Sequence, residues 1–209
     1  MGVAPHQRSL FALGEPHLAA PAAWERVTLD DRSWVDLARG LVDGADALLD
    51  ELVAVVPWTQ GRRQMYERMV DDPRLTRRYA AGEALPHPVL EAVRAELAGR
   101  YRVDPGGAGC NHYRDCNDSV AFHADRELRD RDVDAVVAVL TLGERRPFLL
   151  RPMPGRAGAP RRSRDLAPGP GDLLVMGGRC QRGWEHSVPK VARAGPRVSV
   201  TWRAFTPPE

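Results

Sequence analysis

The segment Arg197–Phe205 constrains the fold of this chain more than any other feature, because polar and apolar residues alternate along it. A period of two predicts a β-strand whose two faces differ in chemistry. The polar face consists of Arg197, Ser199, Thr201 and Arg203, and the apolar face of Val198, Val200 and Trp202. Such a strand needs an apolar layer behind one face, and its two arginines favour anions in front of the other.

The spacing of the two arginines can be compared with the size of a ligand. Six residues at about 3.3 Å each separate the backbones of Arg197 and Arg203 by roughly 20 Å. Side chains that lean toward each other shorten this gap to about the length of a small dicarboxylate, and each guanidinium can hold one carboxylate through paired hydrogen bonds. The alternative is an edge strand with solvated arginines, which is the commoner outcome for an arbitrary alternating strand.

Further strands are expected in the second half of the chain. Apolar runs at 133–142, 147–150 and 172–176 predict buried strands, and the region 151–171, rich in Pro, Gly and Arg, predicts a long surface loop. Near the N-terminus, the pattern over 24–35 indicates short strands around a turn.

Two helices are expected before these strands. Apolar residues at three- and four-residue steps predict an amphipathic helix over 41–56, and a second helix should open at Pro86 and Pro88 and stop at Gly99. Helices followed by many short strands favour an α+β, mainly β chain. The expected architecture is an antiparallel barrel or jelly roll with N-terminal helices packed outside it.

The chain divides into three regions that together predict one compact domain. Residues 1–22 read as a loose N-terminal leader, 23–107 as the N-terminal strands and helices, and 108–209 as the jelly-roll core. A length of 209 residues suits a single domain with a substantial core.

Charge and cysteine content exclude several classes of protein. The net charge of +2 does not mark a nucleic-acid binder, and Lys190 is the only lysine, which genome composition can explain. Cys110, Cys116 and Cys180 form no CxxC pair, so neither a disulfide framework nor a structural zinc site is expected, and a cytoplasmic location is favoured. The apolar run Leu10–Leu13 is too short for a signal peptide, and we expect no membrane contact.

A candidate metal site lies in the second half of the chain. In an extended segment, His123 and Asp125 project to the same side, and His186 is the only histidine downstream. Two histidines and one carboxylate form the triad of non-haem Fe(II) oxygenases. The alternative for an isolated HxD is a histidine hydrogen-bonded to a nearby aspartate. Asn111 and Tyr113 would share a face and offer an amide and a phenol to one ligand, or else serve as a turn residue and a core residue.

These motifs together resemble the AlkB family of Fe(II)- and 2-oxoglutarate-dependent dioxygenases over about residues 108–205. The resemblance rests on Asn111 to Asp115, Asp118-Ser119, His123 to Glu127, Leu142-Gly143, Gly171 to Met176, His186, and Arg197 to Arg203. The segment from Pro57 to Leu75 looks like the family's substrate-binding lid.

The resemblance implies a fold, cofactors and residue roles. It implies a double-stranded β-helix (jelly-roll, cupin-like) core in which His123, Asp125 and His186 bind Fe(II). Arg203 and Asn111 would bind the C1 end of 2-oxoglutarate, and Arg197 and Tyr113 its C5 carboxylate. Ser199 stands where the family often has Asn, and O₂ is the remaining cosubstrate.

The resemblance also implies a reaction. Family members decarboxylate 2-oxoglutarate to succinate and hydroxylate a C–H bond. On N-alkylated bases of DNA or RNA the product releases formaldehyde, which is repair by oxidative demethylation. The implied partner is alkylated nucleic acid, and we expect a monomer without an obligate protein partner.

The residues that would contact such a substrate are less constrained by the sequence. Glu127 would face the base if the chain stays extended, or else pair with Arg126 or Arg129 in solvent. Trp58 and Tyr66 could stack on a flipped base, and Arg114 is a further candidate. Two other functions stay open: the same chemistry on a protein or small molecule, and a binding module that has lost turnover.

Overall fold

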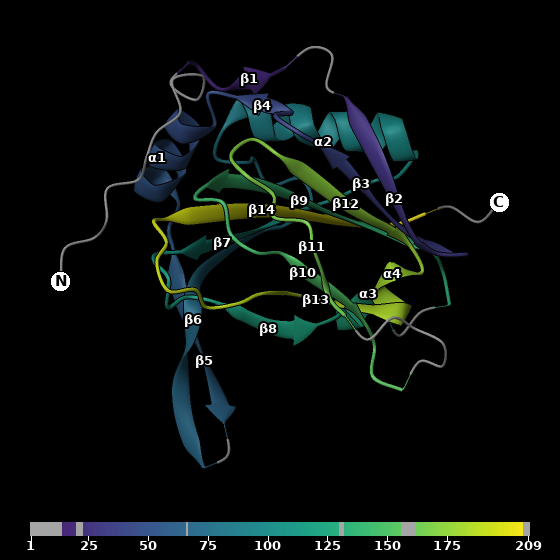
Figure 1. The fold of residues 1–209 in the computed structure, drawn as a ribbon. Coiled ribbons are helices and arrows are strands. Elements are labelled where there is room, and N and C mark those ends of the chain that lie inside the picture. Colours follow the sequence, from purple (N-terminus) through teal and green to yellow (C-terminus); the bar gives the residue numbers. More distant parts are fainter. Residues whose placement is uncertain (1–13, 20–22, 66, 130–131, 156–161, 207–209) are drawn as a thin grey trace.

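The computed structural model describes residues 14–19, 23–65, 67–129, 132–155 and 162–206, and most of its strands form two sheets (Figure 1). The larger sheet contains β2 (Trp24–Asp30), β3 (Ser33–Ala38), β5 (Thr59–Met65), β6 (Arg68–Tyr79), β7 (Ala108–Tyr113), β9 (Ala135–Gly143), β12 (Leu173–Gly178) and β14 (Arg197–Phe205). The smaller sheet contains β8 (Val120–His123), β10 (Leu149–Pro152), β11 (Arg164–Asp165) and β13 (Trp184–Val188). The strand orders are β2-β3-β12-β9-β14-β7-β6-β5 and β11-β10-β13-β8.

The alternating segment forms β14, which lies in the interior of the larger sheet. It pairs antiparallel with β9 along one edge and with β7 along the other. An edge strand with solvated arginines is therefore excluded. The N-terminal strands join the same sheet, β3 beside β12 and β6 beside β7.

Helices cover one face of the larger sheet and the smaller sheet faces the other, as expected for a jelly roll. The two longer helices, α1 (Ala45–Val55) and α2 (Pro88–Tyr101), pack on the outer face (Figure 1). The four-residue helices α3 (Arg126–Arg129) and α4 (Cys180–Gly183) flank β8 and β13 in the sequence. The predicted mainly β fold with external helices is confirmed.

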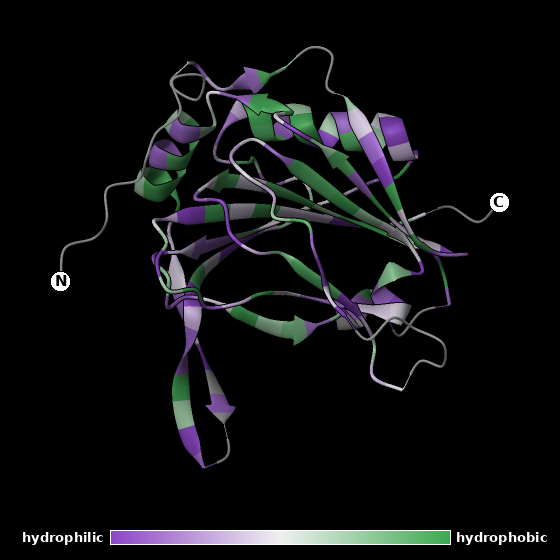
Figure 2. Cartoon of the chain, viewed as in Figure 1, coloured by the Kyte–Doolittle hydropathy of each residue, from purple (hydrophilic) through white to green (hydrophobic). Residues whose placement is uncertain are grey.

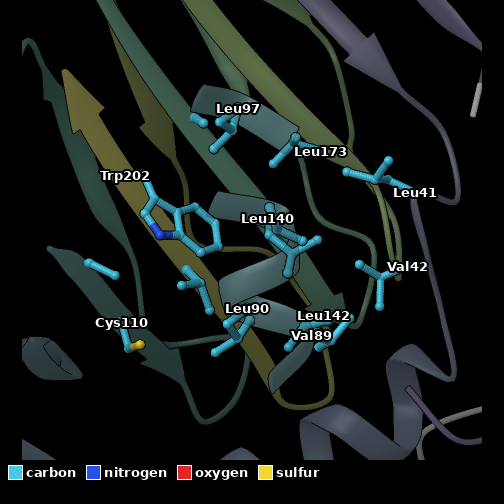
Figure 3. Close-up of a cluster of buried hydrophobic side chains, with 14 of the residues drawn as sticks. Leu41, Val42, Val89, Leu90, Leu97, Cys110, Leu140, Leu142, Leu173 and Trp202 are labelled. Carbon is cyan, nitrogen blue, oxygen red and sulfur yellow. The ribbon is translucent and has the colours of Figure 1, made fainter. Parts of the chain in front are cut away.

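The main core lies between the helices and the larger sheet, whose central strands are largely apolar (Figure 2). Every second residue of β9 and β14 points into it, including Leu140 and Trp202. Figure 3 shows the Trp202 indole among leucines such as Leu97 and Leu173. A second apolar cluster, with Leu150 and other residues, fills part of the space between the two sheets.

The start of α1 and the end of α2 differ from the predicted positions because of contacts with distant segments. Helix α1 starts only at Ala45, because Val42–Asp43 forms the short strand β4, which pairs with β1 (His17–Leu18). Gly44 then turns the chain with a φ of 68°. Helix α2 continues through Gly99, since the Tyr101 hydroxyl docks on buried Asp36 at 2.8 Å.

Two other N-terminal segments gain structure that the sequence did not indicate. Strand β1 falls within the predicted leader, most of which lies outside the described residues. The arginine-rich segment before α2 forms a β5–β6 hairpin that projects from the body of the molecule (Figure 1). Within the described part of the chain, no helix combines the length and apolarity needed to cross a membrane.

Candidate active site

A cleft between the two sheets contains most of the residues predicted to bind metal and cosubstrate. It encloses about 490 Å³, part of which is open to solvent. Its polar lining comes from five strands and consists of Arg74, Asn111, Tyr113, His123, His186, Arg197, Ser199, Thr201 and Arg203. Valines and Phe148 form the rest of the wall.

At one end of the cleft, His123, Asp125 and His186 come together. His123 of β8 and His186 of β13 are direct cross-strand partners, with ring centroids 4.2 Å apart. One ligand atom from each of the three residues lies within 4.8 Å of the others. Two imidazoles and one carboxylate suit a divalent iron and leave coordination positions for further ligands.

The environment of each imidazole prepares it for a metal. His123 Nδ1 lies 2.9 Å from the Ala121 carbonyl oxygen, which leaves Nε2 for coordination. His186 Nδ1 is buried without a hydrogen-bond partner, and its ring stacks on Phe148. Burial and the neighbouring His123 lower the pKa of His186 to about 3. The ring is therefore neutral at physiological pH, as metal binding requires.

Asp125 reaches the site by a different route from the one expected. The chain does not stay extended, because β8 ends at His123 and α3 begins one residue after Asp125. Arg203 Nε donates to the Asp125 carboxylate at 2.8 Å, and the Gln181 side-chain oxygen accepts its backbone N–H at 3.0 Å. Burial opposes ionisation, but Arg203 and the two imidazoles outweigh it and lower the pKa of Asp125. The carboxylate is thus ionised and held in place.

At the other end of the cleft, Arg197 is a buried cation without an acidic partner among the described residues. It is 1% exposed, and its guanidinium lies 5.2 Å from the centre of the Tyr113 ring. Its Nη2 donates to Thr141 Oγ1 at 3.0 Å, whereas Nε and Nη1 have no partner. A buried charge is costly unless an anion pairs with it, so these two N–H groups fit a ligand carboxylate.

Polar side chains connect the two ends. Asn111 accepts a hydrogen bond from Arg74 Nε at 3.0 Å, and its amide nitrogen lies 3.5 Å from Ser199 Oγ. Along β14, Arg203 stands at the metal end and Arg197 at the far end, with Ser199 and Thr201 between them. The donor set fits an Fe(II) ion at the triad and a dicarboxylate lying along the strand.

The structure does not bring the candidate substrate residues into this cleft. Trp58 packs against His112 and the helix-side core, on the opposite face of the larger sheet. Arg114 is used in a double hydrogen bond to Asp118. Glu127 is exposed, and its Oε1 lies 3.9 Å from Nη2 of Arg78 on β6. Tyr66 lies outside the described residues.

Some residues of the site were not predicted from the sequence. Thr141 had a signal, since it is the one polar residue in the apolar run of β9. Arg74 also had one, because it alternates with Thr76 and Arg78 along β6. Nothing in the sequence indicated Gln181, because its contact with Asp125 joins segments that are 56 residues apart.

Similarity to known proteins agrees with this geometry. The model of the 2OG-Fe(II) oxygenase superfamily matches residues 53–203. Alpha-ketoglutarate-dependent dioxygenase alkB homolog 3 of Mus musculus is 31% identical over 231 residues, covering 94% of this chain and 79% of the relative. The Homo sapiens protein of the same name is 31% identical over 197 residues, covering 84% and 67%. DNA oxidative demethylase ALKBH2 of Arabidopsis thaliana is 29% identical over 190 residues, covering 74% and 60%.

Solved structures share the fold at lower sequence identity. OsALKBH1 is 14% identical with a TM-score of 0.54, covering 86% of this chain and 99% of that one. A Trichoplax adhaerens prolyl hydroxylase in complex with a peptide of hypoxia inducible factor is 13% identical with a TM-score of 0.55, covering 82% and 83%. The chain belongs to the AlkB family of the 2OG-Fe(II) oxygenase superfamily and is an Fe(II)- and 2-oxoglutarate-dependent dioxygenase.

Proposed function

We propose that this dioxygenase demethylates N-alkylated bases in nucleic acid, and that 2-oxoglutarate lies along β14 with its C1 end at the metal. The observation that carries the chemistry is the presence, in one cleft, of the His-Asp-His triad and of the buried Arg197 guanidinium, whose Nε and Nη1 have no partner. The substrate class rests on the relatives, which include a DNA oxidative demethylase that matches this chain at 29% identity.

The chain's own residues bind and orient the reactants. His123, Asp125 and His186 hold the metal, and Arg203 keeps the Asp125 carboxylate ionised and aimed. Arg197, with Tyr113 and Thr141 beside it, receives the distal carboxylate of the cosubstrate. When bound, iron with 2-oxoglutarate and O₂ supplies the oxidation that hydroxylates the methyl group, after which the product releases formaldehyde.

The β5–β6 hairpin supports a nucleic-acid substrate. It lies beside β7, whose Asn111 and Tyr113 line the cleft, and it carries several arginines. Arg62 is paired with Asp71, but Arg74 reaches the cleft itself. Arginines that neutralise phosphates would make binding strongly dependent on salt.

The test is a turnover assay with a matched substrate pair. The protein is incubated with Fe(II), 2-oxoglutarate and an oligonucleotide that carries 1-methyladenine or 3-methylcytosine, and the unmethylated oligonucleotide is the control. We expect formaldehyde and succinate in equal amounts with the methylated strand alone. Succinate formation that depends on a protein or small molecule, and not on either lesion, would assign the chemistry to another substrate.

Two further expectations accompany this proposal. A cytoplasmic monomer without an obligate protein partner stays a prediction, and sedimentation of the purified chain tests the oligomeric state. Glu127 is also proposed to lie near the base, since its carboxylate stays exposed beside Arg78. A loss of demethylation in Glu127→Gln without any loss of 2-oxoglutarate affinity would support that role.

A further inference from the structure

Arg146, in the loop between β9 and β10, is a buried cation that the proposed mechanism does not use. Its side chain belongs to one of the largest fully buried residues of the protein, at 1% exposure. Both terminal nitrogens donate to backbone carbonyls: Nη1 to Asp115 at 3.0 Å, and Nη2 to Asp118 at 2.8 Å and to Pro189 at 2.7 Å. These acceptors are neutral, and Nε has no partner.

The charge of Arg146 is therefore not cancelled by direct contact with an acid. No carboxylate in the described ranges forms an ion pair with its guanidinium. The Asp118 carboxylate attracts Arg146 electrostatically, but both of its oxygens accept hydrogen bonds from Arg114. Burying a charge without a counter-ion is unfavourable, so the position of Arg146 calls for an anion nearby.

The position of Arg146 relative to the cleft indicates which anion this is. Its guanidinium carbon lies 5.6 Å from the centre of the Tyr113 ring, and that of Arg197 lies 5.2 Å from the same ring. Two buried cations thus flank one phenol at the end of the cleft away from the metal. Burial lowers the pKa of Arg197, and Arg146 lowers it further. A negative charge between β7 and β14 would relieve both cations.

The carbonyls that Arg146 binds belong to loops that adjoin strands lining the cleft. Asp115 and Asp118 lie between β7 and β8, whereas Pro189 follows β13. One side chain therefore joins the connection that follows β7, the strand of Tyr113, to the connection that precedes β14, the strand of Arg197. Its charge is held in a fixed position, unlike that of an exposed arginine.

We propose that Arg146 is a specificity-determining positioning residue that makes the cleft select a dicarboxylate over a monocarboxylate 2-oxo acid. The inference rests on the proposed placement of 2-oxoglutarate along β14. Arg197 contacts the distal carboxylate, while Arg146 acts through Tyr113 and through its field. The selected chemistry is a 2-oxo acid with a second carboxylate at the far end of a five-carbon chain.

The experiment compares equilibrium binding of 2-oxoglutarate with that of 2-oxopentanoate, which has the same length but lacks the distal carboxylate. Calorimetry with Mn(II) in place of Fe(II) avoids turnover. In Arg146→Met, we expect 2-oxoglutarate to bind about tenfold or more weakly, because a buried unit charge near the proposed position of its distal carboxylate is lost. The affinity for 2-oxopentanoate should be unchanged. Arg146→Lys should restore most of the preference, and exposed Arg145→Met, the adjacent control, should change neither affinity.

Equal weakening of both acids in Arg146→Met would show a purely structural role and overturn the proposal. If that variant does not fold, Arg197→Met provides the test. Because Arg146 is still present in Arg197→Met, this variant should keep a residual preference for 2-oxoglutarate over 2-oxopentanoate. A complete loss of that preference would reject the proposal. If the wild-type protein binds both acids equally, the proposed placement of 2-oxoglutarate along β14 is wrong. This result differs from the one that would reject the role of Arg146 alone.

Discussion

From Arg197 to Trp202 both faces of β14 are buried, and yet the two faces serve different purposes. Val198 and Trp202 on one face and Arg197 and Thr201 on the other are all buried. The apolar face packs against the helices and β-sheet core, whereas the polar face leaves guanidinium nitrogens without partners. Burial alone therefore does not distinguish a core from a site. The apolar face also leaves one polar group without a partner, the indole N–H of Trp202, but the group left unsatisfied on the cleft face, Arg197, is charged.

The difference has an energetic meaning. A buried polar group without a partner costs about 1–3 kcal/mol, and more if it is charged. The helix-side face carries mainly apolar contacts, which stabilise the fold directly. The cleft face lowers the stability of the empty protein, and a ligand that supplies acceptors recovers that loss as binding affinity. Substitutions on the two faces should accordingly affect different measurements.

The largest effect is expected at the metal end of the cleft. Asp125→Ala and His186→Ala should each lower turnover by more than the roughly 10–100-fold typical of residues that only support a ligand, because each removes a ligand itself. His112→Ala is the matched control, since His112 is buried on the helix side against Trp58. Turnover that survives in His186→Ala but disappears in His112→Ala would contradict the assignment.

The next effect concerns stability on the apolar face. Trp202→Ala should lower the free energy of unfolding by about 3–5 kcal/mol, as expected for the loss of a fully buried aromatic side chain. Thr201→Ala, one residue away on the cleft face, should cost about 1 kcal/mol or less. Urea denaturation measures both changes. Similar losses for the two variants would mean that the faces do not differ as described.

A smaller effect is expected for a residue that acts through a metal ligand. Gln181→Leu removes the acceptor of the Asp125 backbone N–H and should weaken Mn(II) binding about 10–100-fold. Gln181→Glu keeps an oxygen at the same position and should weaken it less. Unchanged metal affinity in Gln181→Leu would show that Arg203 alone holds Asp125.

The smallest effect is a dependence of stability on pH at the helix side. Burial and the hydrogen bond to Asp36 raise the pKa of Tyr101 above its ordinary value of about 10. The unfolded chain thus loses this proton first, so stability is complete below pH 10 and falls above it, by at most about 1.4 kcal/mol per pH unit. Tyr101→Phe should show a shallower decline in urea titrations above pH 10, and an unchanged slope would exclude this origin.

The strands were predictable where hydrophobic periodicity decides their position. β14 occupies the predicted range, and β9 and β12 lie within a few residues of theirs, because each buries one or both faces. The β5–β6 hairpin was missed because its segment is polar, and it is a strand pair only through its pairing with β7. The stop at Gly99 was wrong because packing of Tyr101 outweighs the helix propensity of glycine.

The features of the site also divide into those that local sequence patterns predicted and those that depend on distant contacts. His123, Asp125 and the arginine pair were found because their spacing and alternation are local, and His186 because it is the only histidine downstream of Asp125. The path that brings Asp125 to the metal was not predicted, since it depends on Gln181 and Arg203, which are distant in sequence. Trp58 was assigned to the substrate from its residue type, which does not say on which side of the sheet it lies.

Arg197→Met tests the central contrast most directly, because one variant reports on both binding and stability. Calorimetry with Mn(II) should show 2-oxoglutarate affinity lower by at least about 30-fold, which corresponds to about 2 kcal/mol. The free energy of unfolding of the empty protein should stay within about 1 kcal/mol of wild type or rise, since an unpaired buried charge is replaced by an apolar side chain. Unchanged 2-oxoglutarate affinity, or a loss of stability as large as that of Trp202→Ala, would contradict the account.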